Sequence, residues 1–382
     1  MAGGRSPRVL VAGDDYYASL AVVRGLRAGG YEPWFATHAA ATFAARSRAT
    51  AGTFTLPRPA RGNDAYVAAL AEAARECGAE VVLAGNDLPL KALAGRNADF
   101  PAGTVLSAPT PDVVERTTDK AVLAALAAEV GLATPPTVEV TLAELPVRRE
   151  QLAFPAVAKP ASSAVGERDR TWVAPPAQLV EDVSALERLL AKSPRWLVQP
   201  YLDGVLTAVA GVAWNGNIVC SVHQAALRVH PAQVGVSAYA EAIPADPALD
   251  SALGEVLRRL GWSGIFQFQL IRHGGAAHVI DLNPRPYGSL ALAIGAGANL
   301  PAIWVDCLLG REPGNASYRA GTYFRAELRD ARALLDALRQ RRLSEALSIA
   351  RPRRRTVHAI FSVRDPAPVL ALLQRARNER DA

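Results

Sequence analysis

The residues best suited to chemistry lie in two short segments that are separated by a pair of glycines. Gln269 precedes Gly274-Gly275, and Asp281 and Asn283 follow it. Two apolar runs joined by Gly-Gly predict a β-hairpin. Since alternate residues of a strand share a face, Asp281 and Asn283 would point the same way, and Gln269 can join them from the partner strand. Such oxygen-bearing side chains suit a Mg²⁺ held partly by substrate phosphates. The alternative is a polar strand end that closes in an ordinary Asn-Pro turn.

A small parallel sheet is predicted to precede this hairpin. Residues 9–12 read as a strand, followed by the turn Gly13-Asp14-Asp15, a helix to Gly29-Gly30 and a second strand at 33–37. A helix at 65–77 and a buried strand at 80–85 continue the pattern. Residues 1–108 therefore indicate a doubly wound domain. Its first turn lacks the glycine spacing of a dinucleotide site, and Asp14 and Asp15 would repel a pyrophosphate, which favours a structural role.

The rest of the chain mixes strands and helices, so the expected class is α/β and α+β multi-domain. Pro109 and Pro111 mark a boundary, and one helix is expected over 112–130. Short strands and one helix are expected over 151–202, and more strands over 205–283. An apolar helix after Gly288 is interrupted by glycines. A tail of helices with a strand at 357–363 completes the chain.

Composition restricts the function classes. Half of the 382 residues are apolar, which favours a large folded core over disorder. The net charge of +6 is modest and no purely basic block occurs, which disfavours nucleic acid as a partner. The first apolar run is too short for a signal peptide or a membrane span, so a cytoplasmic protein is expected. Cys77, Cys220 and Cys307 lack metal-type spacing and are predicted to be core thiols.

The hairpin resembles the metal-binding hairpin of the ATP-grasp superfamily, in which an acidic residue or glutamine precedes a Glu-x-Asn motif. Here the segment is Asp281-Leu282-Asn283-Pro284-Arg285, and the version with Gln269 is similar to carbamoyl phosphate synthetase. The continuation from Tyr287 is more like ATP-grasp proteins related to carboxylate-amine ligases. The resemblance implies Mg²⁺ on Gln269, Asp281 and Asn283. The departure is Asp281, because the family usually has glutamate there.

Two lysines occupy further positions of the family pattern. Lys120 follows Asp119 at the start of a helix, and Lys159 ends a strand; in the family both lysines reach ATP phosphates. Only four of the 42 basic residues are lysine, and a compact ammonium pairs with phosphate oxygens as a point charge. The alternative is two solvated surface lysines. Ser162 and Ser163 lie where the family has a loop that covers phosphate.

The segment 196–204 resembles the hinge that binds adenine between the two lobes. The resemblance places the two backbone contacts on Gln199 and Leu202, with Tyr201 in the same segment. Apolar side chains would sandwich the ring, so few side-chain identities are required. An ordinary buried strand and turn is the alternative.

The implied activity is an ADP-forming ligation with ATP and Mg²⁺. The carboxylate of one small molecule becomes an acyl phosphate, which an amine then attacks. Arg285 is assigned to the developing oxyanion, with a loop-anchoring salt bridge as its alternative role. Asn86, Asp87 and Arg285 are expected at the acceptor site. Two other readings stay open: a Mg-ATP-binding module without catalysis, and a nicotinamide-dependent oxidoreductase, which the missing glycines disfavour.

The resemblance also suggests a division of the chain. Residues 1–108 would form a pre-ATP-grasp domain with a Rossmann-like sheet, and residues 109–310 the ATP-grasp domain, with a lid lobe at about 151–202. Residues 311–382 would form a C-terminal appendage. The expected partners are small-molecule carboxylate and amine substrates, with neither nucleic acid nor a membrane, and a homodimer is common in such folds.

Overall fold

A five-stranded parallel sheet forms the N-terminal part of the protein, in the order β3-β2-β1-β4-β5. The computed structural model describes residues 5–14, 16–39, 42–58, 63–161, 164–167, 170–173, 176–190, 195–314, 316–351 and 353–371, and of 164–167 and 170–173 only the backbone. The strands are β1 (Arg8–Ala12), β2 (Glu32–Thr37), β3 (Thr53–Thr55), β4 (Val81–Ala84) and β5 (Val105–Leu106).

Helices cover this sheet as the apolar pattern predicts. They are α1 (Tyr17–Ala28), α2 (Asp64–Cys77) and α3 (Asp87–Leu93), with a short 3-10 turn at Asn97–Asp99. The central strand β1 is almost fully buried because alternate residues face helices on opposite sides of the sheet: Val9 and Val11 belong to one apolar cluster, Leu10 and Ala12 to another. The predicted doubly wound arrangement is confirmed.

The connection to the next sheet differs from its prediction. Instead of one helix over 112–130, the chain forms α4 (Pro111–Thr118) and α5 (Lys120–Glu129). Asp119 leaves the helical conformation, and its carboxylate accepts hydrogen bonds from the backbone N–H groups of Ala121 (2.7 Å) and Val122 (3.2 Å). It therefore caps a new helix, a competing role that an aspartate takes readily. The break makes Lys120 the first residue of α5.

A four-stranded antiparallel sheet follows, in the order β10-β7-β11-β6. It has its own apolar cluster, in which Trp196 and Leu186 are fully buried. A separate hairpin, β8 and β9, lies between its strands along the chain. The elements are β6 (Val138–Val140), α6 (Leu145–Arg148), the 3-10 turn Arg149–Gln151, β7 (Ala156–Pro160), β8 (Ala164–Glu167), β9 (Arg170–Val173), β10 (Gln178–Val180), α7 (Val183–Leu190) and β11 (Trp196–Pro200).

The largest sheet has seven strands in the order β16-β15-β12-β13-β14-β17-β18. Its neighbouring strands are antiparallel except for the pair β17 and β18, which is parallel. The elements are β12 (Val205–Trp214), β13 (Asn217–His230), β14 (Val236–Ile243), α8 (Pro247–Leu260), β15 (Gly264–His273), β16 (Ala276–Asn283), α9 (Leu290–Ala296), α10 (Leu300–Leu308), β17 (Tyr323–Arg325), α11 (Glu327–Arg339), α12 (Leu343–Ala350) and β18 (Thr356–His358).

Two details of the C-terminal third depart from prediction. The expected strand at 357–363 is limited to Thr356–His358, because the chain turns away where the backbone N–H groups of Ile360 and Phe361 bond to the Glu327 carboxylate instead of a strand. The apolar helix after Gly288 continues through Gly295 and ends at Gly297, whose φ is 118°. Among the described residues no single helix is long and apolar enough to span a membrane, although the sharply bent pair α9 and α10 passes by length and composition.

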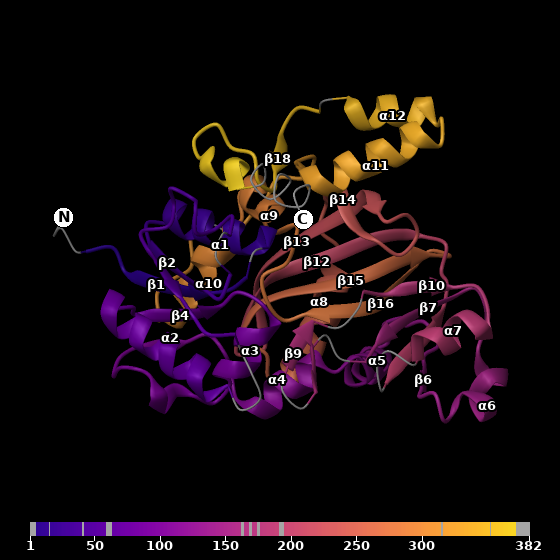
Figure 1. Cartoon of the computed structure of the whole chain (residues 1–382), viewed down its shortest axis with the longest axis horizontal. Coiled ribbons are helices and arrows are strands. Elements are labelled where there is room, and N and C mark those ends of the chain that lie inside the picture. Colours follow the sequence, from indigo (N-terminus) through magenta and orange to yellow (C-terminus); the bar gives the residue numbers. More distant parts are fainter. Residues whose placement is uncertain are drawn as a thin grey trace.

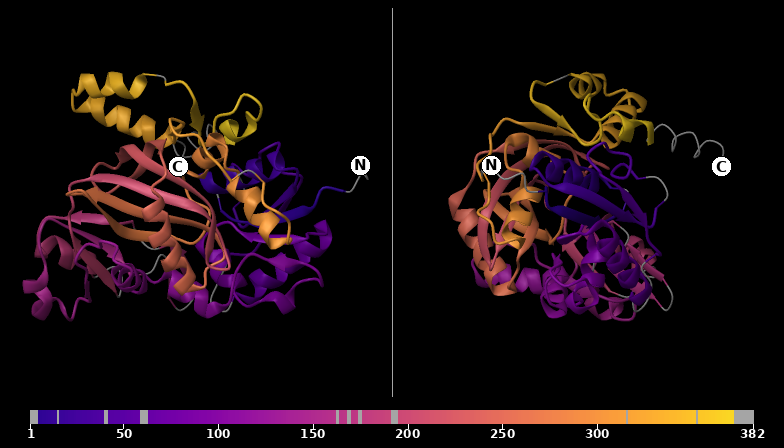
Figure 2. Two further views of the ribbon diagram at one scale, coloured as in Figure 1. Left: turned by 180° about the vertical axis from the view of Figure 1, so that it is seen from behind. Right: turned by 90° about the vertical axis from the view of Figure 1, so that its left-hand side faces the viewer.

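The three sheets and the C-terminal helices surround one central region. Figure 1 shows the N-terminal sheet beside the seven-stranded sheet, with the four-stranded sheet below its β16 side and the α11–α12 pair above its β14 side. The reverse and side views in Figure 2 keep α11 and α12 away from the four-stranded sheet. The N-terminal sheet, the four-stranded sheet and the C-terminal helices therefore lie on different sides of the seven-stranded sheet.

Candidate active site

Strands β15 and β16 form the predicted hairpin and place its polar side chains together. Gly274 and Gly275 close the turn with φ values of 57° and 82°, the left-handed conformation that such a turn requires. Across the strands Gln269 is paired with Asp281, and Gln267 with Asn283. Asn283 Nδ2 donates to Gln267 Oε1 at 3.2 Å. Sequence analysis missed Gln267, although it lies two residues before Gln269 and so shares its face.

The two predicted phosphate lysines converge on this hairpin from different elements. Lys120 at the start of α5 forms an ion pair with Asp281. Lys159 in β7 donates to the backbone carbonyl of Ile280 and so connects the four-stranded sheet to the seven-stranded sheet. Two of the four lysines therefore meet at adjacent residues of β16, and neither is a solvated surface residue.

Burial and neighbouring charges both shift the pKa values of Lys159 and Asp281. Lys159 is only 8% exposed, and burial lowers its pKa to about 8; the neighbouring Lys120 adds to the decrease, and Asp281 opposes it. Burial alone would raise the pKa of Asp281, but Lys120 and Lys159 hold it below its usual value. Asp281 is thus ionised at neutral pH, and a phosphate beside Lys159 would favour the charged form of the ammonium.

The oxygen donors fit a magnesium ion that is shared with a nucleotide. Within the described part of the chain, no group of three or more His, Cys, Asp and Glu side chains could hold a metal ion. The predicted set instead has one carboxylate, Asp281, and two amides, Gln269 and Asn283. Mg²⁺ usually keeps several waters and is held by one or two carboxylates together with substrate phosphates. The residues therefore suit Mg²⁺ bound jointly with phosphate, rather than by protein ligands alone.

Arg285 lies next to the hairpin and is held by the N-terminal domain. Its Nε atom donates to Asp87 Oδ2 at 2.8 Å, and Nη1 donates to the carbonyl of Pro286 at 3.1 Å. Burial would lower the pKa of Arg285, but Asp87 and Tyr16 raise it, so the guanidinium stays charged. The salt bridge considered as its alternative role is thus present. It orients Arg285 at the cavity edge, which is compatible with a catalytic role.

Asn86, which was also predicted at the acceptor site, forms hydrogen bonds within the N-terminal domain. Asn86 donates from Nδ2 to Asp14 Oδ2 at 2.6 Å, and its Oδ1 caps α3 by accepting from the N–H of Leu88. His38 lies 3.2 Å from the other Asp14 oxygen. Asp14 therefore organises the edge of the N-terminal sheet with its neighbours.

The predicted adenine hinge lies at the end of β11. Gln199 is buried and donates from Nε2 to Thr137 Oγ1 at 2.8 Å. Tyr201 donates its backbone N–H to Pro155 O at 2.9 Å. Tyr201 and Leu202 are half-buried just past the strand, in the segment that connects β11 to β12. Ser162 and Ser163 lie outside the described residues.

A polar cavity of about 180 Å³ joins the hairpin to the N-terminal and C-terminal regions. It contains the three predicted metal ligands and Arg285. Sequence analysis missed several of its other residues: Tyr16, Gln224, Gln267, Ser289 and Arg329. Gln224 and Ser289 form a buried side-chain hydrogen-bonded pair at 2.8 Å. Ser289 follows the hairpin motif closely, whereas Tyr16, Gln224 and Arg329 belong to no motif, so only the fold shows that they meet.

Other polar residues between the hinge and the hairpin have structural partners. The guanidinium of Arg228 forms an ion pair with the buried carboxylate of Asp330 at 2.6 Å. His223 and His230 pair with Asp250 and Asp336 at 2.9 and 3.0 Å. Val236 and Ser237, at the start of β14, line the cavity.

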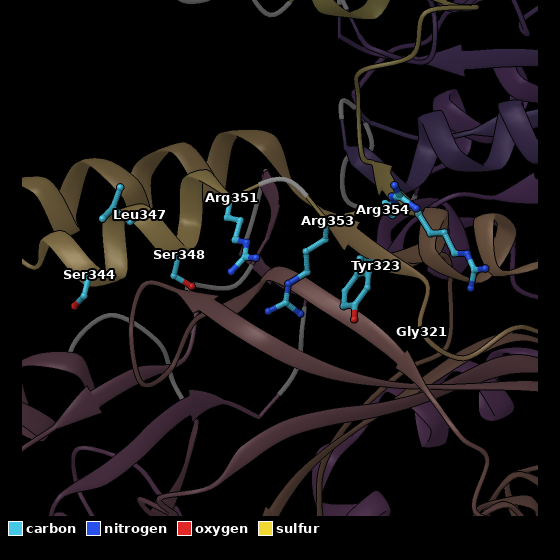
Figure 3. A pocket seen from close by; sticks show the side chains of 9 residues that line it. Gly321, Tyr323, Ser344, Leu347, Ser348, Arg351, Arg353 and Arg354 are labelled. Carbon is cyan, nitrogen blue, oxygen red and sulfur yellow. The ribbon is translucent and has the colours of Figure 1, made fainter.

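A larger hollow of about 760 Å³ lies on the C-terminal appendage (Figure 3). Its wall includes Arg351, Arg353 and Tyr323, and the Arg353 guanidinium lies 5.0 Å from the centre of the Tyr323 ring. None of the predicted site residues lines it. The carboxylate of Asp281 and the amides of Gln269 and Asn283 line the smaller cavity, and the two lysines contact β16 beside it, so this cavity is the better candidate for chemistry.

The protein thus combines a Rossmann-like parallel sheet with two further sheets, and Lys120 of α5 and Lys159 of β7 meet one hairpin of the seven-stranded sheet. Residues 192–328 match a family described as "ATP-grasp in the biosynthetic pathway with Ter operon". This match covers less than half of the chain and includes the hairpin β15–β16. No curated protein matches the sequence significantly.

Solved ATP-grasp structures share the fold at low sequence identity. An N5-carboxyaminoimidazole synthetase from Staphylococcus aureus is 11% identical, with a TM-score of 0.60 over 81% of this chain and 78% of its own. An L-amino acid ligase from Bacillus licheniformis is 17% identical, with a TM-score of 0.60 over 84% and 79%. The biotin carboxylase domain of 2-oxoglutarate carboxylase from Hydrogenobacter thermophilus, solved with MgADP and bicarbonate, is 15% identical, with a TM-score of 0.63 over 84% and 74%.

Proposed function

We propose that this protein is an ATP-dependent ligase that activates a small-molecule carboxylate as an acyl phosphate and transfers the acyl group to an amine. The observation that carries the proposal is the convergence of Lys120 and Lys159 on residues 280–281, beside a polar cavity. The names of the similar structures, a synthetase, an amino acid ligase and a carboxylase domain with MgADP, support an ATP-dependent reaction of this class.

The residues divide the proposed reaction between them. A carboxylate oxygen of the acid forms a bond to the γ-phosphorus while the bond to the bridging oxygen of ADP breaks. Lys120 and Lys159 would neutralise the phosphate oxygens during this step. Bound Mg²⁺ at Gln269, Asp281 and Asn283 would supply further positive charge. In the second step the amine attacks the carbonyl carbon and loses a proton, and phosphate leaves. Arg285, oriented by Asp87, would stabilise the oxyanion.

Two substitutions test the proposal. Lys159→Ala and Asn283→Ala should abolish ADP release that depends on mixtures of small acids and amines. Arg258→Ala removes an exposed cation of α8, far from the cavity lining, and should leave the rate unchanged. Full activity in either of the first two variants would refute the assignment.

The ion pair between Lys120 and Asp281 also favours a second candidate, a Mg-ATP-binding module without catalysis. Asp281 is the only carboxylate of the predicted donor set, and its ion pair with Lys120 competes with the binding of a metal ion. Calorimetry with Mg-ATP, followed by the ADP-release screen, separates the two functions. Binding without turnover in every mixture would favour the module.

The homodimer stays a prediction, which sedimentation velocity would test.

A further inference from the structure

Arg329 is a cation in the cavity that the proposed reaction does not use. It comes from α11, beyond the hairpin and the hinge, and lines the cavity with Arg285 and Tyr16. Its guanidinium carbon lies 5.2 Å from the centre of the Tyr17 ring. Arg285 is neutralised by Asp87, whereas no carboxylate of the described residues pairs with Arg329. A half-buried guanidinium without an acidic partner is suited to bind an anion.

The helix that carries Arg329 is fixed in place by its neighbour in the sequence. Asp330 is only 4% exposed and forms ion pairs with Arg228 at 2.6 Å and with Arg325 at 3.0 Å. Both arginines also lie over the face of Tyr239, 5.4 Å from its centre. These contacts hold the first turn of α11 against the sheet, so Arg329 is presented to the cavity from a rigid position.

Arg329 lines the cavity at one side of the seven-stranded sheet, and the two lysines contact the strand at its other side. Lys120 and Lys159 converge on β16, whereas α11 packs against β13 and β14. The order β16-β15-β12-β13-β14 puts these elements at opposite sides of the sheet, and the side chains of Asp281 and Arg329 line one cavity of about 180 Å³ between them. A small substrate that presents one group at the β16 side can therefore place a second group near Arg329.

The Tyr16 hydroxyl and the Arg329 guanidinium lie close to each other beside Gly288. A Cβ added to Gly288 would lie 2.6 Å from the Tyr16 hydroxyl oxygen and 3.7 Å from Arg329 Nη1. The hydroxyl and the guanidinium thus flank the same backbone segment, which directly follows Arg285-Pro286-Tyr287. A carboxylate can accept from both donors, and a guanidinium binds a carboxylate through two parallel hydrogen bonds.

We propose that Arg329, with Tyr16, binds a carboxylate of the acid substrate other than the one that is phosphorylated. The substrate class is therefore a small dicarboxylate, with or without an amino group. This inference rests on the proposed function, because the phosphorylated carboxylate is assigned to the β16 side. Arg329 is a specificity-determining residue, and the C-terminal appendage contributes it to the site.

Direct binding tests the proposal without turnover. Calorimetry with Mg²⁺ and a non-hydrolysable ATP analogue would compare succinate, glutarate, L-aspartate and L-glutamate with their ω-monoamides. We expect at least one diacid to bind about tenfold or more tightly than its monoamide, since the lost contact is a charge-assisted pair. Arg329→Met should reduce this ratio to about one. Arg329→Lys should keep part of it. Arg332→Met, an exposed change on the same helix, should leave the ratio unchanged.

The outcomes separate this inference from the ligase proposal. If no diacid binds better than its monoamide, or if Arg329→Met keeps the preference, the inference is overturned. Thermal unfolding of Arg329→Met shows whether the variant is folded. A preference that depends on Arg329 without ADP release from ATP would support the inference and count against the ligase. ADP release that monoamides stimulate equally in the wild type and in Arg329→Met would support the ligase and overturn the inference.

Discussion

The lysine that joins the two antiparallel sheets has an unusual protonation equilibrium. Lys159 is buried, and its pKa is lowered to about 8, so a large fraction of the free protein has a neutral amine above that pH. Phosphate oxygens would favour the ammonium and raise the pKa in the complex. Binding of Mg-ATP should therefore take up protons above pH 8, and affinity should fall as pH rises through 8.

This proton uptake is measurable. At pH 8.5, calorimetry of Mg-ATP binding in two buffers of different ionisation enthalpy should show uptake of about 0.8 proton, the neutral fraction for a pKa near 8. An arginine at this position stays charged in both states, so the Lys159→Arg variant should bind without this uptake. Equal proton uptake in the variant and the wild type would assign the titration to another group.

A second residue-scale prediction concerns the space at Gly288. Gly288→Ala would place a methyl group 2.6 Å from the Tyr16 hydroxyl, which forces Tyr16 away from Arg285 and Arg329. We expect the apparent KM for the acid to rise about tenfold, while the affinity for Mg-ATP changes little. Removing the hydroxyl in Gly288→Ala/Tyr16→Phe should restore part of the loss. A double variant no better than Gly288→Ala would show that this contact is not the cause.

At the scale of elements, the packing of α11 against the seven-stranded sheet depends on the buried carboxylate of Asp330. Asp330→Ala would leave Arg228 and Arg325 without their shared partner. We expect a loss of about 3 kcal/mol in the free energy of unfolding, as for a broken buried ion pair with partly exposed arginines. Urea denaturation measures it. Asp336→Ala on the same helix is the control, because Asp336 is 43% exposed and should contribute less than about 1 kcal/mol. Equal losses in both variants would contradict this account of how α11 is held.

Some helices and strands could be predicted from the sequence, and others could not. Alternation and the Gly-Gly turn predicted the hairpin and its shared face, because both depend on neighbouring residues. Periodicity alone missed the break at Asp119, since helix propensity continues through 112–130, whereas the resemblance placed the start of a helix at Asp119-Lys120. Arg329 had no local signal. Its place in the cavity follows from a helix packed over strands about ninety residues earlier in the chain, which periodicity cannot show.

At the scale of the whole molecule, the C-terminal segment connects the two ends of the chain. After β18 the chain crosses to the N-terminal domain, where Asp365 accepts from Arg24 Nε at 2.9 Å, from Ser47 Oγ at 2.6 Å and from the Arg48 backbone N–H at 3.0 Å. Arg24 also donates to the carbonyl of Ile360 at 3.0 Å. The segment that delivers Arg329 and the domain that delivers Tyr16 and Asp87 are therefore held in one arrangement by this contact.

We expect Asp365→Asn to weaken the contact between the C-terminal segment and the N-terminal domain. Burial would raise the pKa of Asp365, but hydrogen bonds from Ser47, Arg48 and Arg24 hold it below its usual value. Its contribution is therefore complete above the unfolded pKa of about 3.9 and is lost as pH falls through the lower folded pKa. At pH 7 we expect the variant to unfold with about 2 kcal/mol less free energy, and this difference from the wild type should disappear in acid.

Hydrogen exchange locates the effect of Asp365→Asn. Amides of residues 42–49 and 356–361 should exchange faster in the variant, while those of β7 and β11 in the four-stranded sheet should not change, because that sheet has a separate core. Mg-ATP affinity should be retained for the same reason, and acid affinity should fall as Tyr16 and Arg329 lose their fixed spacing. A variant that loses Mg-ATP affinity equally would show that the C-terminal contact supports the whole cleft rather than its acid-binding side.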